Sequence, residues 1–144
     1  GFDHGLSPRD ATYAYIVVPN KKTAEDMATY PASNIEILAN SDSMQVVRNK
    51  KLDVWEMVFY RAATFSHGKI TVKVDKGCAL LFKDMENSAS CFHIADPAQA
   101  QSVIRVDVCI PSVAKDTKTI VCDFSDTGIY AGMSKLYSLE KSED

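Results

Sequence analysis

The stretch that decides the fold is "KITVKVD" at 69–75, in which apolar and polar side chains alternate without a break. Ile70, Val72 and Val74 fall on one side of an extended chain, and the lysines and threonine between them fall on the other. A period of two is the pattern of a β-strand with one buried face and one solvated face. Residues 69–75 therefore predict a strand of the kind found in antiparallel sheets.

The same alternation recurs along the chain. It continues in "DVWEMVFY" at 53–60, "SVIRVDVCIP" at 102–111 and "KTIVCDF" at 118–124, and strand-forming residues fill "CALLFK" and "SCFHIA". The alternation assigns these side chains to the core: Trp55, Met57, Phe59, Ile104, Val106, Val108, Ile110, Ile120, Cys122 and Phe124. The runs are separated by these turn signals: "HGK" at 67–69, "DKG" at 75–77, "DMENS" at 84–88 and "SDTG" at 125–128. Such short, even spacing favours an all-β fold, an antiparallel β-sandwich or barrel, over βαβ units.

One short helix is predicted at "TAEDMATYP", residues 23–31. Thr23 is suited to cap its N-terminus, and Glu25 and Asp26 place negative charge in the first turn, where the helix dipole favours it. Asp26 stands where a capping box would carry Glu or Gln, and Pro31 stops the helix. Because strand-like sequence lies on both sides, the helix is interpreted as a connector between two β regions.

Composition limits the function classes. The 144 residues suit one domain, or one domain with part of a neighbour, and 46% apolar with 24% charged residues is ordinary for a folded protein. A net charge of −3 without a basic stripe gives no reason to expect nucleic acid. No apolar run is long enough to span a bilayer, and no signal peptide is visible. Gly1, next to what reads as mid-domain sequence, is interpreted as a tag remnant.

Asp3 and His4, followed by Tyr13 and Tyr15, are the first candidates for acid–base chemistry. A catalytic histidine needs an orienting acceptor, but adjacent side chains in a strand point to opposite faces, so Asp3 is poorly placed to orient His4. Residues 13–18 are apolar on both faces, which predicts an inner strand of packed sheets with the tyrosines packed in it. We therefore interpret the Asp-His pair as part of a turn or corner, with no catalytic residue assigned.

The histidines give no metal site. His4, His67 and His93 are far apart in sequence, and no pair has ligand spacing. His67 is predicted in a turn, and His93 on the strand face opposite Phe92 and its apolar neighbours. Because nucleophile-elbow, phosphate-loop, dinucleotide-binding and EF-hand motifs are also missing, no metal or cofactor is predicted.

Aromatic residues raise the possibility of sugar stacking. Trp55, the single tryptophan, shares its predicted face with core residues, which favours burial over a sugar platform. Tyr60, Tyr130 and Tyr137 are left as candidate surface aromatics, and no substrate-binding residue is assigned.

The four cysteines are Cys78, Cys91, Cys109 and Cys122. Each lies in an apolar stretch, none forms a Cys-x-x-Cys pair, and burial as four small side chains is the favoured interpretation. Two disulfides remain the alternative, and a reactive thiol is a third, because cysteine usage alone does not settle the compartment.

Several segments together resemble polysaccharide lyase family 8, which includes the chondroitin AC, chondroitin ABC-type, hyaluronate and xanthan lyases. The resembling segments are "DHG" at 3–5, "YAYIVVPN" at 13–20, a short helix, "ILAN" at 37–40 and "QVV" at 45–47. "HIADPAQ" at 93–99 is similar to a "DPTQ"-type turn of that family, with Ala98 in place of Thr. The first block is the more specific, and the likeness covers most of the chain.

The resemblance implies a domain layout and a role. Residues 1–22 would be the last strands of a central β-sandwich domain, 23–33 a connecting helix, and 34–140 a C-terminal β-sandwich domain. The family cleaves uronic-acid polysaccharides by β-elimination with residues mainly in a helical toroid, and none of those motifs is in this chain.

The resemblance therefore implies a non-catalytic domain of a secreted or periplasmic lyase, inactive alone. Its implied partners are the rest of the parent lyase, the helical toroid and central β-sandwich, and an acidic polysaccharide. The implied role is support of the catalytic domains and of the substrate cleft. An independent carbohydrate-binding module and a purely structural interaction domain stay open as alternatives, and exported cysteines would be free to pair.

Overall fold

A computed structural model of the chain describes residues 5–7, 9, 13–83, 90–110, 116–125 and 133–139. The chain divides into two compact units, Gly1–Pro31 and Ala32–Asp144.

The first unit contains the helix α1, Ala24–Ala28. As predicted, Thr23 is its N-cap, and its Oγ1 accepts a hydrogen bond from the Asp26 backbone N–H at 3.1 Å. The Asp26 carboxylate accepts in turn from the Lys22 N–H at 3.2 Å, so it takes over much of a capping-box role. The helix ends at Ala28, with Thr29 as its C-cap, slightly before the predicted stop at Pro31.

The predicted strand over residues 13–18 is wrong for this structure. The segment is not part of a strand, and Tyr15 and Val17 are 67% and 75% exposed. An extended segment becomes a strand only when a neighbour takes up its backbone hydrogen bonds, and neither sheet of the described residues includes this segment. Alternation and apolar content alone therefore misled the prediction.

The second unit holds the described strands, which follow a short 3₁₀ turn, η1, at Ala32–Asn34. The strands are β1 (Ile35–Asn40), β2 (Met44–Asn49), β3 (Val54–Phe59), β4 (Ala63–His67), β5 (Ile70–Val74), β6 (Cys78–Lys83), β7 (Ser90–Ala95), β8 (Val103–Cys109), β9 (Lys118–Asp123) and β10 (Lys135–Leu139).

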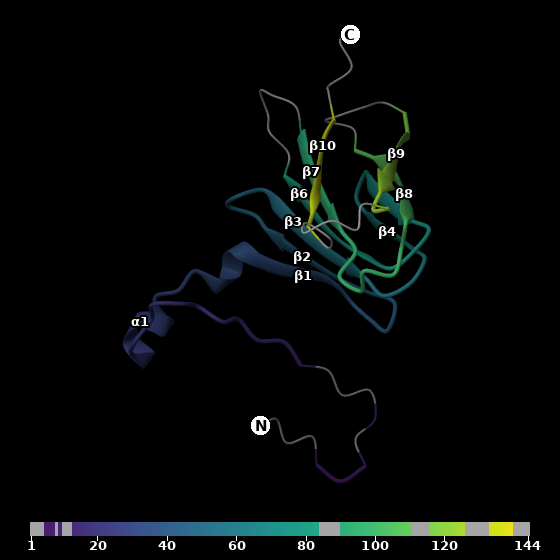
Figure 1. The fold of residues 1–144 in the computed structure, drawn as a ribbon. Helices are drawn as coiled ribbons and strands as arrows, with labels where there is room; N and C mark the ends of the chain where they lie inside the picture. Colours follow the sequence, from purple (N-terminus) through teal and green to yellow (C-terminus); the bar gives the residue numbers. More distant parts are fainter. Residues whose placement is uncertain are drawn as a thin grey trace. The chain divides into compact units, whose positions relative to one another are not determined.

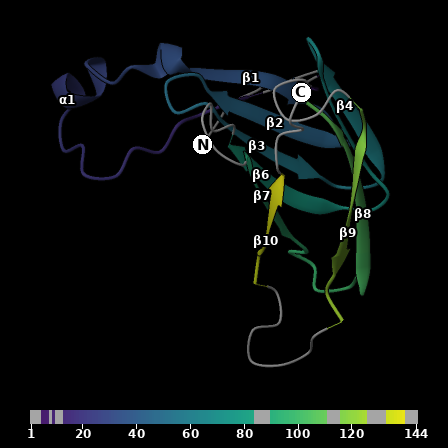
Figure 2. The same cartoon turned by 90° about the horizontal axis from the view of Figure 1, so that it is seen from above.

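Within the described residues these strands form two sheets (Figures 1 and 2). One sheet has six strands in the order β1-β2-β3-β6-β7-β10, and the other has four in the order β4-β5-β8-β9. Neighbouring strands are antiparallel throughout. The all-β antiparallel sandwich with one short helix is therefore confirmed.

The core lies between the two sheets and is built from the side chains that the alternation assigned to it. Met57, Phe59, Ile104, Val106 and Cys122 are at most 2% exposed. Phe82 of β6 and Phe92 of β7 face each other in register, both fully buried, with ring centroids 5.0 Å apart. Opposed aromatic residues on neighbouring strands stabilise a sheet through packing beyond simple area burial.

Gly77 lies where the β5–β6 connection passes the end of β3. A Cβ atom at this position would lie 3.0 Å from the Tyr60 carbonyl oxygen and 3.2 Å from that of Phe59. Because backbone atoms cannot retreat as a flexible side chain does, glycine permits this close approach. A larger residue at this position would push the β5–β6 connection away from the end of β3.

The β7–β8 loop is organised by Asp96, which is 2% exposed. Its carboxylate accepts backbone N–H bonds from Ala98 at 3.1 Å, Ala100 at 2.7 Å and Gln101 at 2.7 Å. A carboxylate with several backbone donors stays solvated by the protein when water is excluded. The "DPAQ" turn is thus wrapped around one buried acid.

Candidate functional site

Asp3 and His4 lie outside the described residues, as does Tyr130. Tyr13 and Tyr15 are described, with rings stacked at 6.3 Å between centroids, and they are 56% and 67% exposed. Their side chains share one face, as predicted for alternate residues, but they are not packed in a sheet.

Trp55 lies in a cluster at one end of the sandwich. It is 2% exposed, which confirms the prediction of a core residue. Its ring contacts Phe65 and His67 of β4, with centroids 6.4 Å and 5.9 Å away. The Arg48 guanidinium lies 4.7 Å from the Trp55 ring centroid and donates to the Asp53 carboxylate at 2.8 Å. The cation covers the indole and is neutralised by Asp53, so this cluster stabilises packing and offers no open platform for a sugar ring.

The remaining histidines belong to different sheets. His67 is the last residue of β4 and pairs with Ile70, so its prediction as a turn residue is off by one position. His93 lies on β7 and is half-buried, whereas Phe92 and Ile94 are fully buried, which confirms its predicted face. Across the described ranges no group of His, Cys, Asp or Glu could hold a metal ion.

Two of the remaining surface aromatics are described. Tyr60 is 56% exposed beside the end of β3, in agreement with the interpretation. Tyr137 is half-buried and packs against the core, so its interpretation as a surface aromatic is wrong. Its ring faces inward because Leu136 takes the outward position of β10.

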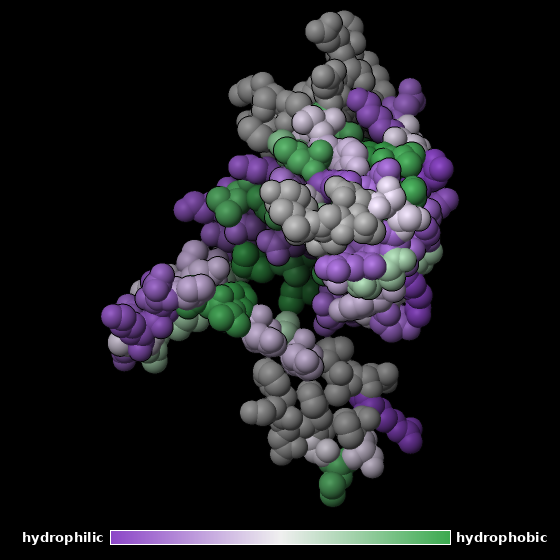
Figure 3. Space-filling model, in the orientation of Figure 1, coloured by the Kyte–Doolittle hydropathy of each residue, from purple (hydrophilic) through white to green (hydrophobic). Residues whose placement is uncertain are grey.

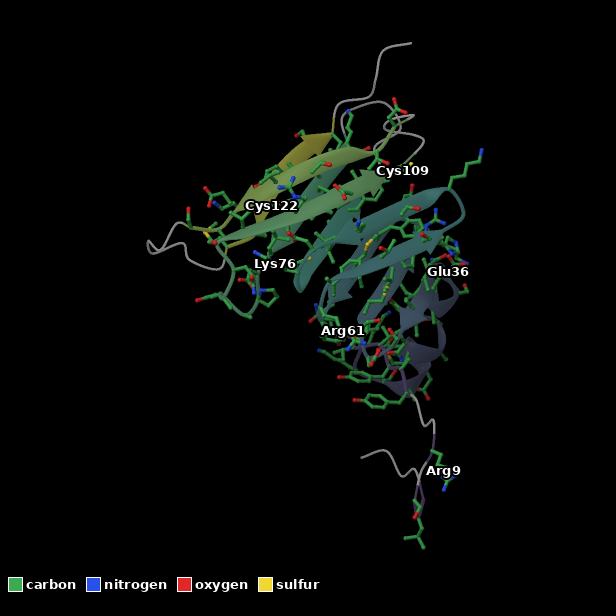
Figure 4. All side chains as sticks on the ribbon, turned by 90° about the vertical axis from the view of Figure 1, so that its right-hand side faces the viewer. Arg9, Glu36, Arg61, Lys76, Cys109 and Cys122 are labelled. Carbon is green, nitrogen blue, oxygen red and sulfur yellow. The ribbon has the colours of Figure 1, made fainter. Side chains whose placement is uncertain are left out.

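All four cysteines are described, and none of them is in a disulfide. Cys78 and Cys122 are buried, whereas Cys91 and Cys109 are half-buried, so the burial prediction holds fully for two of the four. Figure 4 places Cys109 and Cys122 at opposite ends of the neighbouring strands β8 and β9.

Burial raises the pKa of the Cys78 thiol from 9.0 to about 12, and that of Cys122 to about 11. A nearby Cys122 also raises the pKa of Cys78, and a hydrogen bond with Tyr137 lowers that of Cys122. A folded-state pKa above the unfolded value stabilises the fold below pH 9, the unfolded value. That stability is lost as the pH rises through the folded values.

We expect native thiol titration at mildly alkaline pH to separate two pairs of cysteines. Cys91 and Cys109 react first, and Cys78 and Cys122 react only on unfolding, because thiolate formation and access are both suppressed in the core. An aromatic disulfide reagent with and without denaturant measures this, with mass spectrometry to locate the label. Fewer than four thiols in denaturant would revive the disulfide alternative.

Surface ion pairs account for several charged side chains. Arg61 pairs with Asp42 at 2.9 Å, and Lys50 pairs with Glu36 at 3.5 Å (Arg61 and Glu36 are labelled in Figure 4). Exposed pairs of this kind contribute at most about 1 kcal/mol to stability. They are ordinary solvated contacts and mark no reactive group.

Sequence reasoning missed one surface feature, the apolar outer face of the six-stranded sheet. These side chains on it are 37–56% exposed: Ile37, Val58, Leu81 and Leu136. The signal was present in "DVWEMVFY" and "CALLFK", where outward positions carry Val58 and Leu81 in place of polar residues.

Comparison with known proteins gives this fold a family. Residues 36–105 match the family described as polysaccharide lyase family 8, C-terminal beta-sandwich domain. Chondroitinase-AC of Pedobacter heparinus is 35% identical over 99 residues, which are 69% of this chain and 14% of that protein. Xanthan lyase of Bacillus sp. strain GL1 is 29% identical over 100 residues, 69% of this chain and 10% of the relative.

A solved structure agrees with the sequence relatives. A chondroitinase AC lyase superposes with a TM-score of 0.72 at 28% identity, covering 90% of this chain and 19% of that one. The chain thus spans less than a fifth of the proteins it matches. It belongs to polysaccharide lyase family 8 and carries the family's C-terminal β-sandwich domain.

Proposed function

We propose that this chain is a non-catalytic domain of a secreted or periplasmic lyase that cleaves a uronic-acid polysaccharide. The observation that carries the proposal is the match of residues 36–105 to a C-terminal domain, in relatives of which the chain spans 10–14%. The catalytic machinery then belongs to the rest of the parent chain, and this domain supports it and its substrate cleft.

The chemistry of the parent is β-elimination. A base removes the proton at C5 of the uronate, and a neutralised carboxylate stabilises the resulting anion. The electron pair then expels the C4 oxygen and leaves a double bond in the sugar. The roles of base and carboxylate neutraliser fall to residues outside this chain, with none assigned to Asp3, His4, Tyr13 or Tyr15.

The segment before α1 fits the proposed layout. Residues 13–18 include exposed apolar side chains on both faces, among them Ile16 at 42% and Val17 at 75%. A segment with apolar side chains on both faces is suited to the interior of packed sheets, where a neighbouring strand would take up its backbone hydrogen bonds. We therefore propose that residues 1–22 complete the preceding central domain, that 23–33 connect, and that 34–140 form the C-terminal domain.

The isolated chain is expected to release no unsaturated uronide from chondroitin, hyaluronan or xanthan. Ultraviolet absorbance of the product double bond measures this, with the full-length parent lyase as the positive control. Product formed in proportion to the added, purified chain would refute the non-catalytic role. Calorimetry with oligosaccharides separates support from autonomous sugar binding, because an independent module would release heat and raise the melting temperature.

A further inference from the structure

The outer face of the six-stranded sheet carries a row of residues, one from each strand, that is mainly aliphatic and is called the apolar row. Directly opposed residues in the ladder have side chains on the same face. The strand pairings align these residues in one row: Ile37, Val47, Glu56, Leu81, His93 and Leu136. Four of the six are aliphatic, whereas the residues on the solvated face of a sheet are normally polar.

Three of these aliphatic side chains are exposed to solvent in the domain. Ile37 is 53% exposed, Leu81 is 37% exposed, and Leu136 is 56% exposed. A second row beside the first continues the apolar surface through Val58, at 37% exposed, and Ala79, its partner on β6. Contiguous apolar surface of this kind marks a contact site more often than scattered single residues do.

The outer face of the four-stranded sheet is polar by comparison. One of its rows, also in register, consists of Thr64, Lys73, Asp107 and Thr119. The Thr119 hydroxyl donates to the Asp107 carboxylate at 2.6 Å, so this face satisfies its polar groups locally. Val121 and Val103, 50% and 36% exposed, are aliphatic exceptions on it. The outer face of the four-stranded sheet is therefore suited to contact with water, whereas that of the six-stranded sheet is suited to contact with another protein surface.

We propose that the outer face of the six-stranded sheet docks against the preceding part of the same polypeptide in the parent lyase. The inference rests on the proposed function and adds to it the surface through which this domain contacts the rest of the lyase. An aliphatic surface with few charges fits a permanent contact with another domain better than a contact with an acidic polysaccharide.

Chain connectivity favours this occupant over a second copy. The preceding polypeptide enters the sandwich through η1 and β1, and β1 is the edge strand that supplies Ile37 to the apolar row. The matched relatives are also far longer than this chain, which covers 10–19% of them. A domain that is covalently linked at the edge of this face has a high effective concentration near the face, whereas a second copy must reach it by diffusion.

Figure 3 shows hydrophobic residues (green) among hydrophilic ones (purple) on the visible surface of the domain. Glu56 and His93 lie within the apolar row and require polar partners or water at a contact. Their presence predicts a contact with an apolar centre and a small number of hydrogen bonds.

Hydroxyl-radical footprinting of the full-length parent lyase tests the proposal. Leu136 and Val121 are 56% and 50% exposed in the domain, so Val121 is a matched internal control. After correction for intrinsic reactivity, Leu136 and Leu81 are expected to be labelled about tenfold less than Val121, because the centre of an interface excludes water. Equal labelling of Leu136 and Val121 would overturn the docking surface.

Variants of the full-length protein give a second readout. Leu81→Asp together with Leu136→Asp is expected to raise labelling of Ile37, whereas Val121→Asp leaves it unchanged. Protection that disappears on dilution to the monomer would assign the face to a second copy and overturn the proposal. A negative footprinting result would not change the absorbance test of the isolated chain. The docking surface and the non-catalytic role can therefore be refuted independently.

Discussion

Phe92→Ala is expected to lower the free energy of unfolding by about 4 kcal/mol, the largest effect of any single change considered for this domain. Phe92 is fully buried at the centre of β7 and packs against Phe82. Truncation removes the ring's transfer free energy and leaves a cavity that neighbouring strands, fixed by their ladders, cannot fill. Urea unfolding monitored by Trp55 fluorescence measures the loss.

Three further variants make the Phe92 result decisive. Phe92→Leu keeps most of the volume and is expected to lose about a third as much, which preserves a folded protein for measurement. Tyr60→Ala, with a ring 56% exposed, is the matched control and is expected to lose less than about 1 kcal/mol. Adding Phe82→Ala is expected to show a coupling of about 1 kcal/mol between the rings. An equal loss in Phe92→Ala and Tyr60→Ala would contradict the described core.

Asp96→Ala is expected to lower the free energy of unfolding by about 3 kcal/mol. The change removes the acceptor of the N–H groups of Ala98, Ala100 and Gln101 at a site that is 2% exposed. The loop also holds Gln99 at φ 51°, a left-handed conformation that relaxes when its anchor is lost. Differential scanning calorimetry of the variant and wild type measures the loss.

Two controls separate the Asp96 carboxylate from loop truncation in general. Asp96→Asn keeps one acceptor oxygen, and we expect it to recover about half of the lost stability. Asp123→Ala removes a carboxylate that accepts from the Ser125 N–H at 2.8 Å in an exposed position, and we expect a loss below about 1 kcal/mol. A loss for Asp96→Ala as small as that for Asp123→Ala would mean that water replaces the carboxylate.

Much of the fold follows from local alternation. The runs around Trp55, Val72 and Ile104 alternate because one face of each strand is buried, and all three became strands at the predicted positions. β4 and β10 were not predicted, and the reason differs between the two strands. β4 is short, with Phe65 as its single buried residue, and β10 presents Leu136 to the outside while Tyr137 turns inward.

The errors come from properties that neighbours determine. Residues 13–18 have the composition of a strand, but strand formation depends on a partner that the segment itself does not supply. The sequence shows single apolar residues at outward strand positions, but their alignment into one row depends on which strands lie side by side. Asp3 and His4 lie outside the described residues, so the interpretation of that pair as a turn stays a prediction.

The strand order has a consequence for synthesis of the protein. The chain alternates between the sheets, and β10, the last of the strands in the described residues, completes the six-stranded sheet by pairing with β7. Because the ribosome synthesises the chain from the N-terminus, β7 emerges well before β10. Until β10 emerges, the edge of β7 exposes unpaired backbone donors and acceptors beside Phe92 and Ile94. We therefore expect the nascent domain to be most prone to aggregation in the interval between synthesis of Ala95 and synthesis of Leu139.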